Sequence, residues 1–239
     1  MIFKDVFKLN LFKNSVLSIT LACLATSSFA NQNVIGGISL GSTRIIYPMD
    51  AKQVSLAIVN SNLKERFLIN SWIEATDEKK SKDFLITPPL FVAEANTENT
   101  LRIVSLATNL PQDRESVFWV NVKAIPSIDK ANLVDKNILQ LAVLSRIKLF
   151  IRPNHLKMKP EAALNELKFS KSADGVYVNN SSPYHVSFVN IHIDNQKLPN
   201  TMAAPFAQTK IASKTGAKLS YQTVNDYGGL TPKVSLELN

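Results

Sequence analysis

From position 34 onward, apolar and polar residues alternate along much of the chain with a period of two. Residues 54–58 and 118–123 show the pattern clearly, with valine, leucine, isoleucine or phenylalanine at every second position. Strict alternation of this kind is typical of strands with one buried face. Turn-forming residues separate the runs, for example at 60–62, 88–89 and 174–175. Short strands with such punctuation predict an all-β fold of the sandwich type.

The strand candidates fall into two sets. The first set lies between residues 34 and 151 and the second between residues 167 and 238, with a short helical segment of one or two turns at 161–167. Pro153 lies between the sets, and a proline ends strand pairing because it has no N–H to donate. The chain is therefore predicted to form an N-terminal domain over 31–152 and a C-terminal domain over 153–239.

The longest apolar stretch, residues 138–151, allows two interpretations. Leu139, Leu141 and Val143 lie on one side of the expected strand, but the other side is also mostly apolar. One interpretation is a central strand buried on both faces, which composition alone favours; the other is a strand whose second face or edge is reserved for a partner. Alternation also places Lys148 on the side opposite Leu139, so a bulge or a change of surroundings is expected between them.

The first thirty residues have the features of a removable export signal. Lys4, Lys8 and Lys13 precede or flank an apolar run at 16–25, and small residues at Ser28 and Ala30 suit a signal peptidase. The run is too short to span a bilayer comfortably. We therefore expect a signal peptide over 1–30 with cleavage after Ala30, and no stable membrane insertion.

Composition argues against several classes of function. The formal net charge is +8, but basic residues are spread out and aromatics follow strand-core spacing, which argues against nucleic-acid binding. Cys23, the one cysteine, lies in the predicted signal, so no disulfide or thiolate site is expected. His155, His185 and His192 have no metal-ligand spacing and are expected to be surface or partly packed residues. No catalytic motif stands out, so we expect no enzyme, no metal and no cofactor.

Several short motifs, in order, resemble the PapD-like family of periplasmic pilus chaperones. They cover essentially the whole chain after the signal. These motifs occupy residues 42–47, 72–74, 87–89, 110–116, 118–121, 139–142, 146–153, 180–184 and 225–229. Each is weak alone, but their order over two sandwich-sized blocks behind a signal peptide is a strong indication.

The resemblance implies a fold and a function. The fold would be two immunoglobulin-like β-sandwich domains arranged around a cleft. The protein would bind pilus or fimbrial subunits in the periplasm and deliver them to an outer-membrane usher. Leu139, Leu141 and Val143 match the side chains that the family donates to the subunit groove, and this reverses the preference for a strand buried on both faces. A subunit is an incomplete sandwich, and a lent strand would complete it by β-augmentation.

The resemblance also assigns two groups of charged residues. Arg44 and Lys148 match the basic pair that anchors the subunit's C-terminal carboxylate. Glu115, Arg152 and Asp226 match a charge cluster between the domains. Because exposed ion pairs contribute only about 0–1 kcal/mol, we expect that cluster to set orientation more than stability.

Overall fold

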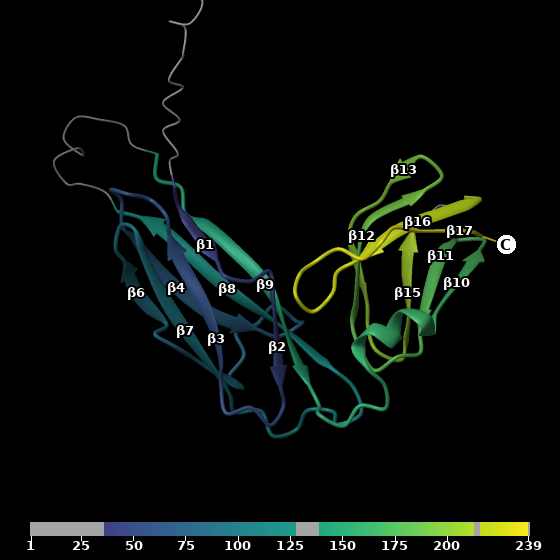
Figure 1. Ribbon diagram of the computed structural model, residues 1–239, viewed down its shortest axis with the longest axis horizontal. Helices are drawn as coiled ribbons and strands as arrows, with labels where there is room; N and C mark the ends of the chain where they lie inside the picture. Colours follow the sequence, from purple (N-terminus) through teal and green to yellow (C-terminus); the bar gives the residue numbers. More distant parts are fainter. Residues whose placement is uncertain (1–35, 128–138, 213–215, 239) are drawn as a thin grey trace, which may run out of the picture. The chain divides into compact units, whose positions relative to one another are not determined.

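The computed structural model describes residues 36–127, 139–212 and 216–238, and Figure 1 shows the strands that dominate them. The predicted signal peptide and its cleavage site lie outside the described residues. Gly36–Asn239 form one compact unit. Within it the strands assemble into two β-sandwiches, so the prediction of an all-β fold with two immunoglobulin-like domains is confirmed.

The first sandwich is built from nine strands in two sheets. One sheet has the order β1-β3-β7-β5 and the other the order β2-β9-β8-β4-β6. The strands are β1 (Ile38–Leu40), β2 (Arg44–Pro48), β3 (Val54–Asn60), β4 (Phe67–Glu74), β5 (Phe84–Thr87), β6 (Leu90–Ala93), β7 (Thr97–Ser105), β8 (Ser116–Pro126) and β9 (Val143–Arg152). Alternate residues of each sheet meet in one core, which includes Leu56, Ile69, Leu101, Val120 and Leu149. The period-two pattern thus marks the residues that this core buries.

The N-terminal strand of the first sandwich changes sheets. β1 pairs with β3, whereas β2 pairs in parallel with β9 in the opposite sheet. The crossing uses Gly41, whose N–H donates to the carbonyl of Ala57 at 2.9 Å. A side chain at Gly41 would bring a Cβ within 2.9 Å of the Ala57 Cβ, so glycine permits this close approach. As a result β2 joins the second sheet only at Arg44.

The second sandwich follows Pro153 and a short 3-10 helix, η2 (Pro160–Glu166). One sheet has the order β10-β11-β15, and the other the order β13-β12-β16-β17, with β14 also pairing with β12. The strands are β10 (Leu167–Ser172), β11 (Gly175–Asn180), β12 (Val186–Ile193), β13 (Gln196–Lys197), β14 (Thr201–Ala203), β15 (Ala207–Ala212), β16 (Lys218–Thr223) and β17 (Val234–Glu237). Its core is separate and includes Val178, Phe188, Ile191 and Leu219.

Candidate functional site

Two basic residues lie side by side at the start of β2. Arg44 and Lys148 are direct partners in the parallel register of β2 and β9. The Lys148 Nζ donates a hydrogen bond to the Ser187 Oγ at 2.8 Å, and the Arg44 Nη1 donates to the Val224 carbonyl at 3.0 Å. Both acceptors belong to the second sandwich. The structure therefore brings the predicted basic pair together and fixes it from both domains.

Burial works against the charges of this pair. Burial, together with the smaller effect of the neighbouring Arg44, lowers the pKa of Lys148 from 10.5 to about 8. Burial also lowers the pKa of Arg44, although Asp226 and Glu115 partly oppose that shift. The Arg44 Nε is buried with no hydrogen-bond partner in the described part of the chain. Two adjacent cations with spare donors make a favourable site for a carboxylate, because charge-assisted hydrogen bonds are the strong ones.

The outer edge of β9 is covered only in its second half. β2 pairs with residues 148–152 of β9 and begins at Arg44, so residues 143–147 have no strand on that side among the described residues. We call this stretch the open edge. It carries backbone groups available for pairing with another chain. The basic pair marks the point at which the open edge ends.

The apolar residues predicted to be donated lie beside or within this open edge. The exposed fractions of Leu139, Leu141 and Val143 are 81%, 67% and 63%. The expected strand over 138–151 is shorter than predicted: β9 begins at Val143, residues 139–142 are not in a strand, and Ile138 lies outside the described residues. The interpretation of a strand buried on both faces therefore holds for Leu149, Phe150 and Ile151 but not for Val143 and Leu144.

No bulge separates Lys148 from this apolar face. The β8–β9 register runs without a shift from Ser116↔Ile151 to Ala124↔Val143. Val143 thus lies on the same face as Leu149 and Ile151, which point into the first core. Lys148 lies on the opposite face, where it contacts Ser187 of the second sandwich. The two faces simply have different surroundings, and the expected bulge is absent from this register.

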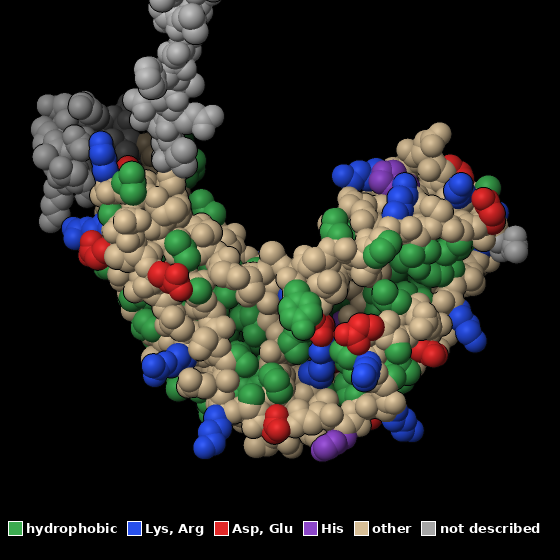
Figure 2. All heavy atoms as spheres, in the orientation of Figure 1, with side chains coloured by type: hydrophobic (Ala, Val, Ile, Leu, Met, Phe, Trp, Pro, Cys, Tyr) green, Lys and Arg blue, Asp and Glu red, His purple; other side chains and the backbone are tan. Residues whose placement is uncertain are grey.

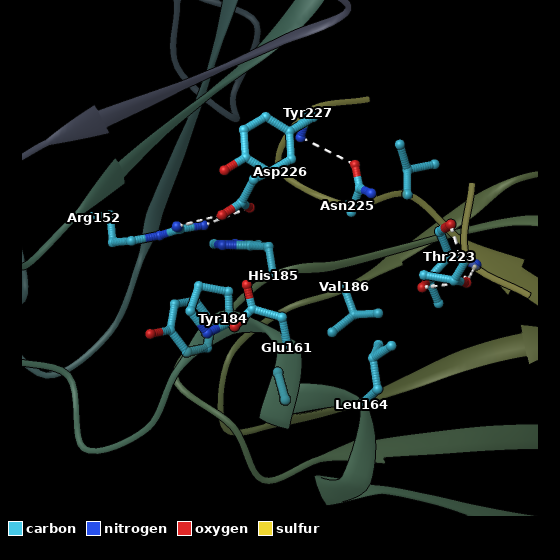
Figure 3. A pocket seen from close by; sticks show the side chains of 14 residues that line it. Arg152, Glu161, Leu164, Tyr184, His185, Val186, Thr223, Asn225, Asp226 and Tyr227 are labelled. Atoms are coloured by element: carbon cyan, nitrogen blue, oxygen red, sulfur yellow. Dashed lines mark hydrogen bonds and ion pairs between the residues drawn. The ribbon is translucent and has the colours of Figure 1, made fainter. Parts of the chain in front are cut away.

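The predicted charge cluster is assembled around Arg152. The Arg152 Nε donates to the Glu115 Oε1 at 2.8 Å. Its Nη1 and Nη2 donate to the two Asp226 oxygens at 2.6 and 2.8 Å, a pairing that Figure 3 shows. The second Glu115 oxygen accepts the His185 backbone N–H at 2.8 Å. These carboxylates hold the pKa of Arg152 above its usual range, against the effect of burial. The cluster joins Glu115, which precedes β8, and Arg152 at the end of β9 to Asp226 of the second sandwich.

Burial changes the energetic role that we expected for this cluster. The Glu115 side chain is 2% exposed, so its pair with Arg152 is not the exposed pair that the sequence suggested, whereas the Asp226 side chain is 32% exposed. Removing one partner of a buried, hydrogen-bonded ion pair typically costs about 3–5 kcal/mol, because a charge is left buried and uncompensated. The cluster should therefore contribute to stability as well as to orientation.

Sequence reasoning missed some of the residues that support the site. Ser187 and the Val224 carbonyl are contributed by segments far along the chain, and no local signal distinguishes them. It also missed Arg146, whose guanidinium carbon lies 4.4 Å from the centroid of the Trp119 ring. Alternation along 119–121 and 144–148 could have shown that Trp119, Arg146 and Lys148 share one sheet face.

A pocket of about 350 Å³ borders the charge cluster (Figure 3). Its apolar wall includes Leu164 and Val186, and Tyr184, His185 and Asp226 line it as well. The Tyr184 hydroxyl is already used, since it donates to the Met158 carbonyl at 2.6 Å. Within the three described ranges, no group of three histidine, cysteine or acidic side chains is placed to hold a metal ion. No helix there is long and apolar enough to cross a membrane.

Comparison with known proteins gives two family matches. Residues 37–157 match the N-terminal domain of PapD, a pili and flagellar-assembly chaperone, and residues 162–235 match the C-terminal domain of the pili assembly chaperone PapD. The chain is 53% identical over 212 residues to the probable fimbrial chaperone SfmC of Escherichia coli K12, covering 88% of this chain and 92% of SfmC. It is 45% identical over 202 residues to the chaperone FimC of the same strain, covering 83% of each.

Solved structures agree with these matches. The periplasmic chaperone SfaE is 43% identical, with a TM-score of 0.74 over 83% of this chain and 98% of SfaE. The structure of the Salmonella enterica SafA pilin in complex with the SafB chaperone matches with 26% identity and a TM-score of 0.75, over 85% of this chain and 97% of the matched chain. Sequence and fold therefore agree over both sandwiches, and the chain belongs to the PapD-like family of pilus-assembly chaperones.

Proposed function

We propose that this protein is a periplasmic chaperone that binds pilus or fimbrial subunits by lending them β9. The observation that supports this most strongly is the open edge of β9, which ends at Arg44 and Lys148. Membership of the chaperone family supplies the type of partner. Periplasmic location is part of the same proposal, supported by the resemblance to the periplasmic chaperone SfaE. Delivery to an outer-membrane usher is proposed from the family resemblance of the sequence motifs.

The direction of a bound strand follows from β2. β2 runs parallel to β9 and occupies its outer edge from Lys148 onward. A subunit strand that continues this line along residues 143–147, in the same direction, reaches Arg44 and Lys148 with its C-terminal end. Its terminal carboxylate then meets two cations. The anchor would also set the register of pairing, which otherwise can slip by two residues.

Apolar contacts would supply much of the binding energy. Leu139, Leu141 and Val143 are exposed here and would be buried in the groove of an incomplete subunit sandwich. Burying one such aliphatic side chain contributes roughly 1.5–3 kcal/mol. Strand addition of this kind is the general mode by which chaperones complement pilins. The proposal thus assigns pairing to the open edge, affinity to the exposed leucines and valine, and register to the basic pair.

The charge cluster has a supporting role in this proposal. Glu115, Arg152 and Asp226 join the two sandwiches next to the basic pair, whose acceptors Ser187 and Val224 lie in the second sandwich. Holding the two domains together in this way keeps Arg44 and Lys148 in a defined position.

The experiment that tests the proposal is co-purification from periplasm. The tagged chaperone is expected to bring down a pilus or fimbrial subunit that mass spectrometry identifies. Arg44→Ala and Lys148→Ala are expected to reduce the captured subunit at least tenfold, because the carboxylate loses a charge-assisted partner. Lys168→Ala, an exposed lysine of β10, serves as a control and should capture as well as wild type. Normal capture by both anchor variants, with circular dichroism showing a folded protein, would contradict the anchor.

A further inference from the structure

The side chain of Asn121 is buried without hydrogen-bond partners. Asn121 lies in the middle of β8 and is 1% exposed. Neither its Nδ2 nor its Oδ1 has a partner in the part of the chain that the structure describes. Buried polar groups are normally paired, and an unpaired one carries its full desolvation penalty. An amide with both groups unpaired therefore calls for a partner from outside the chain.

Asn121 lies on the sheet face next to the open edge of β9. Its direct neighbours across the sheet are Arg146 on β9 and Trp72 on β4. Trp119, two residues earlier on β8, lies on the same face and pairs with Lys148. Arg146 belongs to the open edge and lies over the Trp119 ring, with 4.4 Å between the guanidinium carbon and the ring centroid. Arg146 and the two indoles are thus the neighbours of Asn121 on this face of the sheet.

The ion pairs that hold Arg146 in place are long. The Arg146 Nη2 lies 3.4 Å from the Glu74 Oε2, and its Nη1 lies 3.8 Å from the Glu78 Oε1. The other Glu74 oxygen already accepts the Trp72 Nε1–H at 2.7 Å. Long, partly exposed ion pairs of this kind contribute little. Moving away from Trp119 costs Arg146 its cation–π contact with that ring as well as these ion pairs, so contacts with the subunit must offset that cost.

We infer that Asn121 and Arg146 form a second polar contact for the bound subunit, one that accepts a carboxamide side chain. The inference rests on the proposed function, which places the subunit strand beside Arg146. Two strand spacings, about 9.6 Å, separate the backbones of β8 and that strand, so a long side chain and not the main chain must bridge them. A glutamine side chain is long enough and offers both a donor and an acceptor, which matches both unpaired groups of Asn121. Arg146 then turns toward the subunit and leaves room for this pair.

Asn121→Leu should change both the stability of the chaperone and its binding of the subunit. The substitution keeps the approximate shape of the side chain but removes the unpaired polar atoms. The melting temperature of the chaperone without subunit should rise by about 2–4 °C, because a desolvation penalty is removed. Subunit binding should weaken by about fivefold to tenfold, because a hydrogen-bonded contact is lost. A gain in stability together with a loss of binding distinguishes a contact residue from a structural one.

The matched control is Ser71→Ala. Ser71 on β4 is 2% exposed and its Oγ also lacks a partner in the described ranges, but it occupies a core-facing position between Trp72 and Asn70 in the strand. This variant should bind the subunit as wild type does. Binding is read by co-expressing each variant with differently tagged wild type and measuring how the co-purified subunit divides between the two tags.

Subunit capture by wild type and the variants tests the Asn121 contact and the proposed function separately. If wild type captures no subunit, the proposed function fails. If wild type and Ser71→Ala capture subunit, Lys148→Ala does not, and Asn121→Leu competes equally with wild type, only the Asn121 contact is overturned. A lower melting temperature or a misfolded Asn121→Leu also overturns it, because the amide would then stabilise the chaperone without any partner.

Discussion

The surroundings of Lys148 favour the neutral form of its amine. Burial and the adjacent Arg44 lower its pKa to about 8, whereas an unfolded chain leaves lysine near 10.5. The unfolded state therefore binds more protons between pH 8 and 10.5, and the stability of the chaperone should rise with pH across this window as far as Lys148 determines it. Capture of a carboxylate has the opposite dependence, because it requires the protonated amine.

Subunit capture should accordingly fall as the pH rises from 7 to 9.5. Loss of the Lys148 charge removes one of the two cations that bind the carboxylate, while Arg44 keeps its own. Pull-down of the subunit across this pH range measures the effect. Lys148→Arg is the control, since arginine stays protonated, and its capture should vary less with pH. Identical pH profiles for wild type and Lys148→Arg would show that Lys148 does not titrate in the binding step.

Some of these residues could be predicted from the sequence and others could not. Resemblance to the family indicated Arg44, Lys148 and the cluster of Glu115, Arg152 and Asp226, and the structure places each group together. Their burial was not predictable, because it depends on contacts between segments up to 180 residues apart, such as Arg44 with the Val224 carbonyl. The low exposure of Glu115 in particular changes the expected energy of the cluster.

At the scale of the element, the two halves of β9 have different surroundings. Its second half is buried, since Leu149 and Ile151 have exposed fractions of 0% and 1%, whereas Val143 on the same face is largely exposed. An apolar sequence shows which residues avoid water but not whether their own core or a partner covers them. The strand begins at Val143, whose partner is Ala124. Beyond it β8 reaches Pro126, which has no N–H for a further pair.

The same substitution at two leucines of the apolar segment 139–151 should have opposite effects. Leu141→Glu should leave the melting temperature near that of wild type, because the side chain is already exposed, but it should abolish subunit capture by placing a charge in an apolar groove. Leu149→Glu is the matched control and should unfold the protein, because it places the same charge in the first core. Thermal melting and pull-down measure both. A destabilised Leu141→Glu would mean that this residue serves the chaperone's own fold.

At the scale of the whole molecule, two separate cores are joined by a few polar contacts around one site. Figure 2 shows that charged side chains of both signs are scattered over the visible face, with hydrophobic groups between them. The sequence predicted two sandwiches because alternation and the break at Pro153 are local signals. It could not predict the change of sheets between β1 and β2, which creates the open edge, because that crossing depends on the contact between Gly41 and Ala57.

Backbone hydrogen exchange of the chaperone alone and in its subunit complex tests the central claim most directly. The amides of residues 143–147 that do not bond to β8 should exchange fast in the chaperone alone and become protected in the complex, because the subunit strand pairs with them. β17 (Val234–Glu237), an edge strand of the second sandwich, should be unchanged. A stable complex in which the open edge of β9 still exchanges as fast as in the chaperone alone would contradict strand donation.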